Sequence, residues 1–247
     1  MGRMSTLAPV SPTFSIQRAA ERGYADHGWL KARHSFSFAD YFDPEYQQWG
    51  ALRVFNDDRI AGGTGFPPHP HRDMEIVTYV FSGELAHEDT MGNRGVVKAG
   101  GIQFMSAGTG VRHSEFNASP DTELHLVQMW ILPGKEGVEP SYGQLDFTVE
   151  DRRNRWLTAV SGRAGVDAPI RITQDASLHL SRLEAGRLTH TFDPKRYGFL
   201  FVGEGTVHVN GERLEAGDAV RLYDIPTLDL AGSGEVVLWD LPATQGD

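Results

Sequence analysis

The sequence contains no cysteine in its 247 residues. That absence excludes disulfide bonds, zinc–thiolate clusters and thiol catalysis, and it fits a reducing compartment. Long hydrophobic runs are missing too: no apolar stretch exceeds four residues, so no segment is expected to span a membrane. The opening MGRMSTLAPVSPTFS has no apolar core of the kind that a secretory signal needs. We expect residues 1–14 to form a flexible leader and the protein to be cytoplasmic.

Basic residues are scarce. The chain has 23 lysines and arginines against 33 aspartates and glutamates, which gives a formal net charge of −10. Such a balance repels phosphate backbones, so direct nucleic-acid binding is not expected. Arg152, Arg153 and Arg155 form the only basic cluster. We interpret that cluster as a solvated loop.

Glycine and proline are abundant by contrast, with 28 and 13 residues. So many turn-forming residues favour short strands over long helices. Apolar or alternating runs lie between the turns, at 34–38, 51–55, 75–81, 102–106, 124–132, 156–160, 177–183, 197–202, 205–211, 219–223 and 235–241. No helical pattern separates them, so the sequence predicts an all-β protein of antiparallel sandwiches or barrels.

Two segments of the chain resemble each other. YVFSGELAHED…GVVKAGGIQFMSAG begins at residue 79, and FLFVGEGTVHVNGERLEAGDAVRLYD begins at residue 199. Each reads as a strand, a G-E turn, a strand, a hairpin and an A-G turn into a further strand, which indicates two similar β domains. The polar and proline-rich stretch 133–155 is the predicted join. We therefore expect an N-terminal barrel over residues 1–135 and a C-terminal barrel over residues 136–247.

Two pairs of polar side chains carry the predicted chemistry. His69 and His71 lie two residues apart, and His113 and Glu115 repeat that spacing. Residues i and i+2 of an extended strand share a face, so each pair points both side chains the same way. On neighbouring strands the pairs would bring four ligands to one point inside a barrel. Imidazole with carboxylate suits iron, manganese, nickel, copper or zinc, so the sequence predicts one divalent metal site.

The identity of the fourth ligand stays open on these grounds. Glu75 follows His69 and His71 with the same parity, so it could face the same way along an unbroken strand. It is therefore an alternative to Glu115 as the fourth ligand. Its other possible role is to hold an imidazole N–H from outside the metal's own ligands.

The other histidines are interpreted as structural. His87, in AHEDTMGN, is expected to cap a hairpin, with a place at the mouth of the site as the alternative. His125 lies in an apolar strand and is expected to be a hydrogen-bonded core residue. His179, His190 and His208 are far apart in the sequence. We therefore expect no metal ligands in the C-terminal barrel.

The ligand segments resemble a known pair of motifs. The first cupin motif is matched by Gly63, His69, His71, Glu75 and Gly83, and the second by Gly108, Gly110, His113 and Asn117. Two departures stand out: the spacer before Gly83 is one residue longer than usual, and Gly108 stands where the motif has proline. Together with the segments 21–44, 69–93 and 106–117, the motifs resemble the pirin family, especially its bacterial members described as quercetin dioxygenases. The resemblance is dense over about residues 16–133.

The resemblance implies a bicupin fold of two antiparallel jelly-roll barrels, with metal in the N-terminal barrel alone. It implies four ligands, His69, His71, His113 and Glu115. That set favours Glu115 over Glu75. The expected cofactor is iron(II), with manganese, nickel, copper, cobalt or zinc as alternatives.

The same resemblance implies a reaction: 2,3-cleavage of a flavonol such as quercetin by O2. Glu115 would then also be a catalytic residue, as the base that takes the proton of the flavonol 3-hydroxyl. The alternative to an enzyme is a metal- or redox-sensing pirin-type binding protein that regulates a protein partner.

Overall fold

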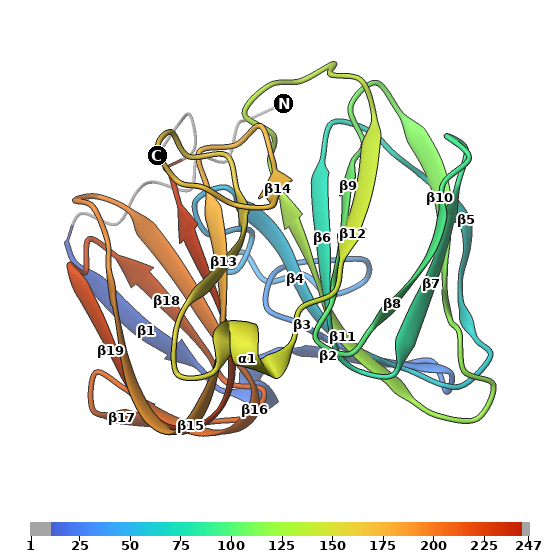
Figure 1. Cartoon of the computed structure of the whole chain (residues 1–247). Coiled ribbons are helices and arrows are strands. Elements are labelled where there is room, and N and C mark those ends of the chain that lie inside the picture. The colour runs from blue at the N-terminus through green and yellow to red at the C-terminus, as the bar shows by residue number, and fades with distance from the viewer. Residues whose placement is uncertain (1–10, 244–247) are drawn as a thin grey trace.

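The structure, a computed structural model, describes residues 11–243. Nearly all regular elements in that range are strands, arranged in three sheets (Figure 1). Two short helices, η1 (Ala19–Glu21) and α1 (Val149–Arg152), complete the set. Apart from β13 with β14, the named strands pair antiparallel, so the all-β, antiparallel prediction is confirmed. No helix within residues 11–243 combines the length and the apolar character needed to cross a membrane.

Two sheets enclose the N-terminal barrel. The seven-stranded sheet runs in the order β12 (Ser141–Leu145), β9 (Ile102–Ser106), β6 (Glu75–Ser82), β11 (Leu124–Ile131), β4 (Leu52–Ile60), β3 (Leu30–His34) and β2 (Gly23–Asp26). The four-stranded sheet runs β5 (Gly65–His71), β10 (Val111–Asn117), β7 (Glu84–Asp89) and β8 (Arg94–Lys98). Leu85 and Val97 of the smaller sheet pack with Val80 and Leu126 of the larger one, which closes the interior between them.

The third sheet curls into the C-terminal barrel. Its eight strands are β1 (Thr13–Gln17), β18 (Ala219–Tyr223), β16 (Tyr197–Val209), β19 (Thr227–Leu241), β15 (Ser177–Thr191), β13 (Leu157–Ser161) and β14 (Ile170–Arg171) in order, with β17 (Glu212–Glu215) on β16. The three long strands β15, β16 and β19 bend across the barrel (Figure 1). Their inward side chains, among them Leu200, Val207 and Leu230, form a separate core.

The largest core lies between the two barrels, and it explains why the strand at 75–82 is apolar on both faces. Alternate residues of β6, Val77, Tyr79 and Phe81, join this shared core. The residues between them, such as Ile76 and Val80, face the interior of the N-terminal barrel. Because side chains alternate along a strand, a sheet buried on both faces needs apolar residues at both parities.

The two similar sequence segments have the same backbone hydrogen bonds. Gly100 N donates to Val80 O at 2.8 Å, and Gly217 N donates to Val202 O at 2.7 Å. Both glycines have positive φ, 86° and 91°, a conformation that favours glycine. Val202 in the C-terminal barrel therefore occupies the position that Val80 has in the N-terminal barrel.

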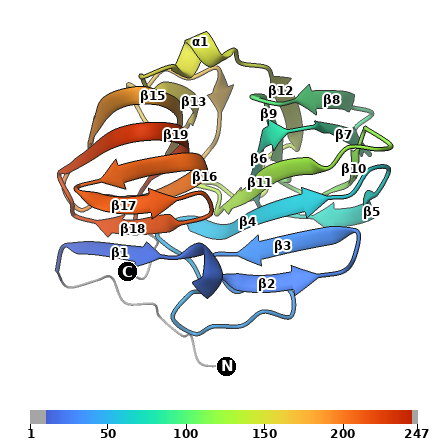
Figure 2. The ribbon, with the colours of Figure 1, turned by 90° about the horizontal axis from the view of Figure 1, so that it is seen from below.

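Two strands cross the predicted division at residue 135. β1 precedes it but pairs with β18 of the C-terminal sheet, as Figure 2 shows. β12 follows it but pairs with β9 of the N-terminal sheet. The division itself stays a prediction. Of the predicted leader, residues 1–10 lie outside the described residues, and Thr13 and Phe14 belong to β1.

The expected strand at 34–38 and the expected solvated loop at Arg152 were both wrong. Residues 35–38 are not a strand, because Ser37 Oγ donates to Asp43 O at 2.9 Å and accepts from Asp43 N at 2.8 Å, which folds the chain into a loop. Arg152 is not solvated: it is 4% exposed, and its Nε donates to Glu235 Oε1 of β19 at 3.2 Å.

The shared core should dominate stability. Phe199 is fully buried there, with its ring centroid 4.8 Å from that of Phe55 and 5.5 Å from that of Phe36. Phe199→Ala is expected to lower the free energy of unfolding by about 3–5 kcal/mol, measured by urea denaturation. The matched change Phe42→Ala, at a side chain that is 70% exposed, should stay within about 0.5 kcal/mol. Equal effects of the two changes would contradict the shared core.

Candidate metal centre

The pairing of β5 with β10 brings the predicted histidines together. The strands are antiparallel, and His69 lies opposite His113. β5 is an edge strand of its sheet, which is where prolines such as Pro67, Pro68 and Pro70 can be accommodated because proline cannot donate to a ladder. The three imidazoles of His69, His71 and His113 have ring centroids 4.5–4.8 Å apart. Each offers a ligand nitrogen, and these nitrogens lie within 4.8 Å of one another.

Nitrogen atoms of the three imidazoles converge at this point. His69 Nδ1 lies 2.8 Å from Pro67 O, and a carbonyl only accepts, so Nδ1 carries the hydrogen and Nε2 has a free lone pair. That Nε2 is 3.0 Å from His113 Nε2. Among the described residues, the buried His71 Nε2 has no hydrogen-bond partner. Unsatisfied buried nitrogens are uncommon, and a cation held between the rings would satisfy them.

The imidazoles of His71 and His113 are in the protonation state that a metal requires. Burial, together with the neighbouring His113 and His69, lowers the pKa of His71 to about 4. Burial also lowers the pKa of His113 to about 3, again with a contribution from His69. Both rings are therefore neutral at neutral pH, and neutral imidazole is the form that binds metals.

Glu115 lies beside His113 and is held by two amides. It is 2% exposed, and the β-ladder shifts register between His113 and Glu115. Its Oε1 accepts from Gln103 Nε2 at 2.6 Å and its Oε2 from Gln128 Nε2 at 2.8 Å. Its carboxylate groups with His113 and His87, since one ligand atom of each lies within 4.8 Å of the others. His113 thus belongs to both groups of potential ligands.

Glu75, the alternative, lies elsewhere. Asp73 has φ of +45° in the turn between β5 and β6, so the alternation that would have aligned Glu75 with His69 and His71 is broken there. The Glu75 carboxylate instead accepts from Thr173 N at 3.1 Å and from Thr173 Oγ1 at 2.6 Å. It therefore joins the N-terminal barrel to the C-terminal half of the chain.

The expectation that His87 caps a hairpin was wrong, because its side chain is buried beside His113. It is 4% exposed, and its ring lies 5.3 Å from that of His113 and stacks at 4.2 Å on Tyr142 of β12. Its Nε2 is 3.0 Å from Asp89 Oδ2. The interpretation of His125 is confirmed: it is buried, with Nε2 2.8 Å from Asp57 Oδ1.

The sequence analysis missed the two glutamines that hold Glu115. Gln103 and Gln128 are polar residues in the otherwise apolar strands IQFMS and LHLVQMWI. A buried polar side chain in such a strand needs a hydrogen-bond partner. Their presence in these strands could therefore have indicated a buried polar site. Trp130 Nε1 extends the chain of contacts by donating to Gln128 Oε1 at 3.1 Å.

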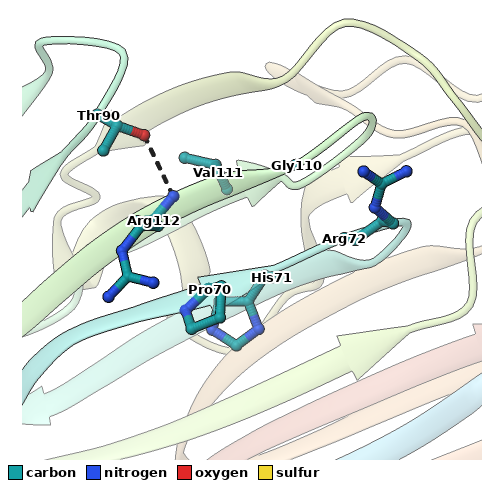
Figure 3. A pocket seen from close by; sticks show the side chains of 7 residues that line it. All are labelled: Pro70, His71, Arg72, Thr90, Gly110, Val111 and Arg112. Carbon is teal, nitrogen blue, oxygen red and sulfur yellow. Dashed lines mark hydrogen bonds between the residues drawn. The ribbon is translucent and has the colours of Figure 1, made fainter.

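A shallow hollow of about 430 Å³ reaches His71 from outside (Figure 3). It is lined by Pro70, His71, Arg72, Thr90, Gly110, Val111 and Arg112. Figure 3 shows the guanidinium groups of Arg72 and Arg112 at its two ends. Arg112 N donates to Thr90 Oγ1 at 3.2 Å, which joins β10 to the end of β7.

Comparison with known proteins agrees with this geometry. The pirin family model matches residues 14–131, and a model described as the quercetinase C-terminal cupin domain matches residues 163–241. A quercetin 2,3-dioxygenase of Escherichia coli K12 is 40% identical, over 92% of this chain and 98% of its own. The chain belongs to the pirin family. The bicupin prediction is thereby confirmed.

Two further relatives are bacterial proteins. A pirin-like protein of Caulobacter vibrioides is 46% identical, over 88% of this chain and 95% of its own. The crystal structure of the bacterial pirin YhhW of Escherichia coli in complex with nickel(II) matches with a TM-score of 0.87 and 39% identity. That match covers 94% of this pirin and all of the other chain.

Removal of the imidazoles tests the centre. The double change His71→Ala and His113→Ala should remove one equivalent of tightly bound transition metal per chain, measured by elemental analysis after gel filtration. Affinity should fall by more than about a hundredfold, since groups outside the ligand shell alone contribute about 10- to 100-fold. His27→Ala, a change at an exposed histidine, is the control. Unchanged metal content in the double variant would exclude these ligands.

The two glutamates make a second test. Glu115→Gln is expected to weaken metal binding at least about tenfold, because a charged oxygen beside His113 is lost while the shape is kept. Glu75→Gln should leave metal affinity within about twofold and act on stability instead, through the contact with Thr173. Competition with a chromogenic chelator measures the affinities. The opposite order would make Glu75 the ligand.

Proposed function

We propose that this pirin is a metal-dependent dioxygenase that performs 2,3-cleavage of a flavonol such as quercetin with O2. The observation that supports it is one cluster of converging imidazoles beside a carboxylate held by two amides, next to a hollow open to solvent. The relatives named quercetin 2,3-dioxygenase support the same class of reaction. The proposed ligands are His69, His71, His113 and Glu115.

The residues of the chain would bind and orient the substrate. When bound, a divalent ion such as iron(II) supplies Lewis acidity and redox chemistry towards O2. Glu115 is the carboxylate that groups with His113, and we assign to it the role of accepting the proton of the flavonol 3-hydroxyl. Gln103 and Gln128 restrain both of its oxygens, so the acceptor is held in place before the substrate arrives.

The walls of the site suit an aromatic anion. The ring of Trp130 lies edge-on to His71 at 4.9 Å, and Tyr142 stacks on His87. Arg72 and Arg112 place positive charge at the ends of the hollow, which stabilises the flavonol anion that forms once the 3-hydroxyl has given up its proton.

Turnover is the decisive measurement. Protein loaded with iron(II) without oxygen and then exposed to air should bleach quercetin catalytically, with one O2 consumed per substrate in an oxygen electrode. Glu115→Gln with equal metal content should be at least about a hundredfold slower, as expected for the loss of a positioned base. Glu88→Gln, on the exposed face of β7, is the matched control and should retain full activity.

A negative outcome has a defined meaning. If none of iron, manganese, nickel, copper, cobalt or zinc supports turnover above the free ion, while one metal still binds per chain, the dioxygenase proposal fails. The protein would then be the metal- or redox-sensing binding protein that the sequence left as the alternative.

A further inference from the structure

The C-terminal barrel contains a second cluster of potential ligands. His179 and His190 of β15 and Asp240 of β19 each offer one atom, and these atoms lie within 4.8 Å of one another. The two rings are 4.8 Å apart, although the two residues are far apart in the sequence. A straight strand would separate them by about 36 Å at 3.3 Å per residue. β15 bends instead, at a register shift between Leu183 and Gly186.

This cluster occupies the place that the candidate metal centre has in the N-terminal barrel. Val202 and Val80 are equivalent in the two barrels. Gly198 lies four residues before Val202, and Ile76 lies four residues before Val80. Asp240 pairs with Gly198, and Trp130 pairs with Ile76. Asp240 therefore occupies the position in the C-terminal barrel that Trp130 has in the N-terminal barrel. The Trp130 ring packs against His71. The bicupin plan thus places polar side chains at the same end of both interiors.

Both imidazoles have a nitrogen available. Among the described residues, the buried His190 Nε2 has no hydrogen-bond partner, and it lies 3.7 Å from Asp240 Oδ2. His179 Nδ1 is 3.0 Å from Thr158 Oγ1, which fixes the ring and leaves Nε2 for a ligand. Burial lowers the pKa of His179 to about 3, with a further contribution from His190, so the ring is neutral at neutral pH.

Asp240 is already bound to two guanidiniums, and this limits what the cluster can hold. Its Oδ1 accepts from Arg196 Nε at 2.7 Å, and its Oδ2 accepts from Arg163 Nη1. A carboxylate has about four lone-pair directions, so Oδ2 retains one for a cation. The guanidiniums also pair with Asp175 at 2.7 Å and Asp193 at 2.6 Å. The side chains of Asp175 and Asp193 are 57% and 72% exposed, so they offset the two guanidiniums only in part.

We propose that His179, His190 and Asp240 bind a second divalent transition metal ion, of the zinc class, inside the C-terminal barrel. Two imidazoles and one carboxylate form a three-ligand set that zinc accepts, with the fourth position open. Because Arg163 and Arg196 compete for Asp240, this site binds more weakly than the one in the N-terminal barrel. The bound ion joins the two halves of β15 to the end of β19. The proposal is independent of the dioxygenase reaction.

Zinc titration of the full chain tests the site. The background is the His71→Ala and His113→Ala variant, so that the N-terminal centre does not contribute. Isothermal titration calorimetry should show one zinc ion bound per chain, and zinc should raise the melting temperature by selective binding to the folded state. Adding His190→Ala, or separately His179→Gln, should weaken zinc binding by more than about a hundredfold and abolish the rise in melting temperature.

Adding His208→Ala, at an exposed histidine of the same barrel, should leave both readouts unchanged. Three outcomes would overturn the proposal: a background variant that binds no zinc, zinc bound as tightly after His190→Ala and His179→Gln, or zinc lost with His208→Ala. The third outcome would show that the ion sits on the protein surface.

Discussion

The antiparallel register of β5 with β10 is the constraint on which the candidate site depends. It sets His69 opposite His113, and the alternation of each strand then turns His71 to the same side. A slip of one residue would turn one set of side chains to the outer face and separate the imidazoles. The prolines of β5 stiffen that strand. The register shift in β10 changes the direction of the Glu115 side chain.

The second barrel stabilises the strands that carry the site. The seven-stranded sheet is buried on both faces, because the shared core covers the side that turns away from the imidazoles. Polar contacts cross the same boundary: Tyr79 OH donates to Glu235, which also accepts from Arg182 at 2.7 Å. Glu75 acts similarly at the start of β6, immediately after the turn that follows His71. The C-terminal barrel therefore packs against the outer face of the seven-stranded sheet. It supplies no residue to the cluster of His69, His71 and His113.

The two barrels share a backbone plan but carry different chemistry. The matched glycine turns show that the plan is the same, while Trp130 in one barrel corresponds to Asp240 in the other. In the N-terminal barrel an aromatic wall and two amides surround the imidazoles and the carboxylate. In the C-terminal barrel two arginines hold the carboxylate, which makes it less available to a cation.

The sequence by itself determined the fold class, the repeated strand plan and the shared face of His69 and His71, because alternation and turn chemistry are local properties of the chain. Strands such as 102–106 and 219–223 were bounded correctly for that reason. Only the tertiary structure decided which way Glu75 faces, since one positive φ at Asp73 breaks the parity along the strand. It alone showed the burial of His87, the role of Gln103 and Gln128, and the meeting of His179 with His190. Those contacts depend on where strands bend and on which faces of the sheets are buried. Neither property can be read from the separation of residues along the sequence.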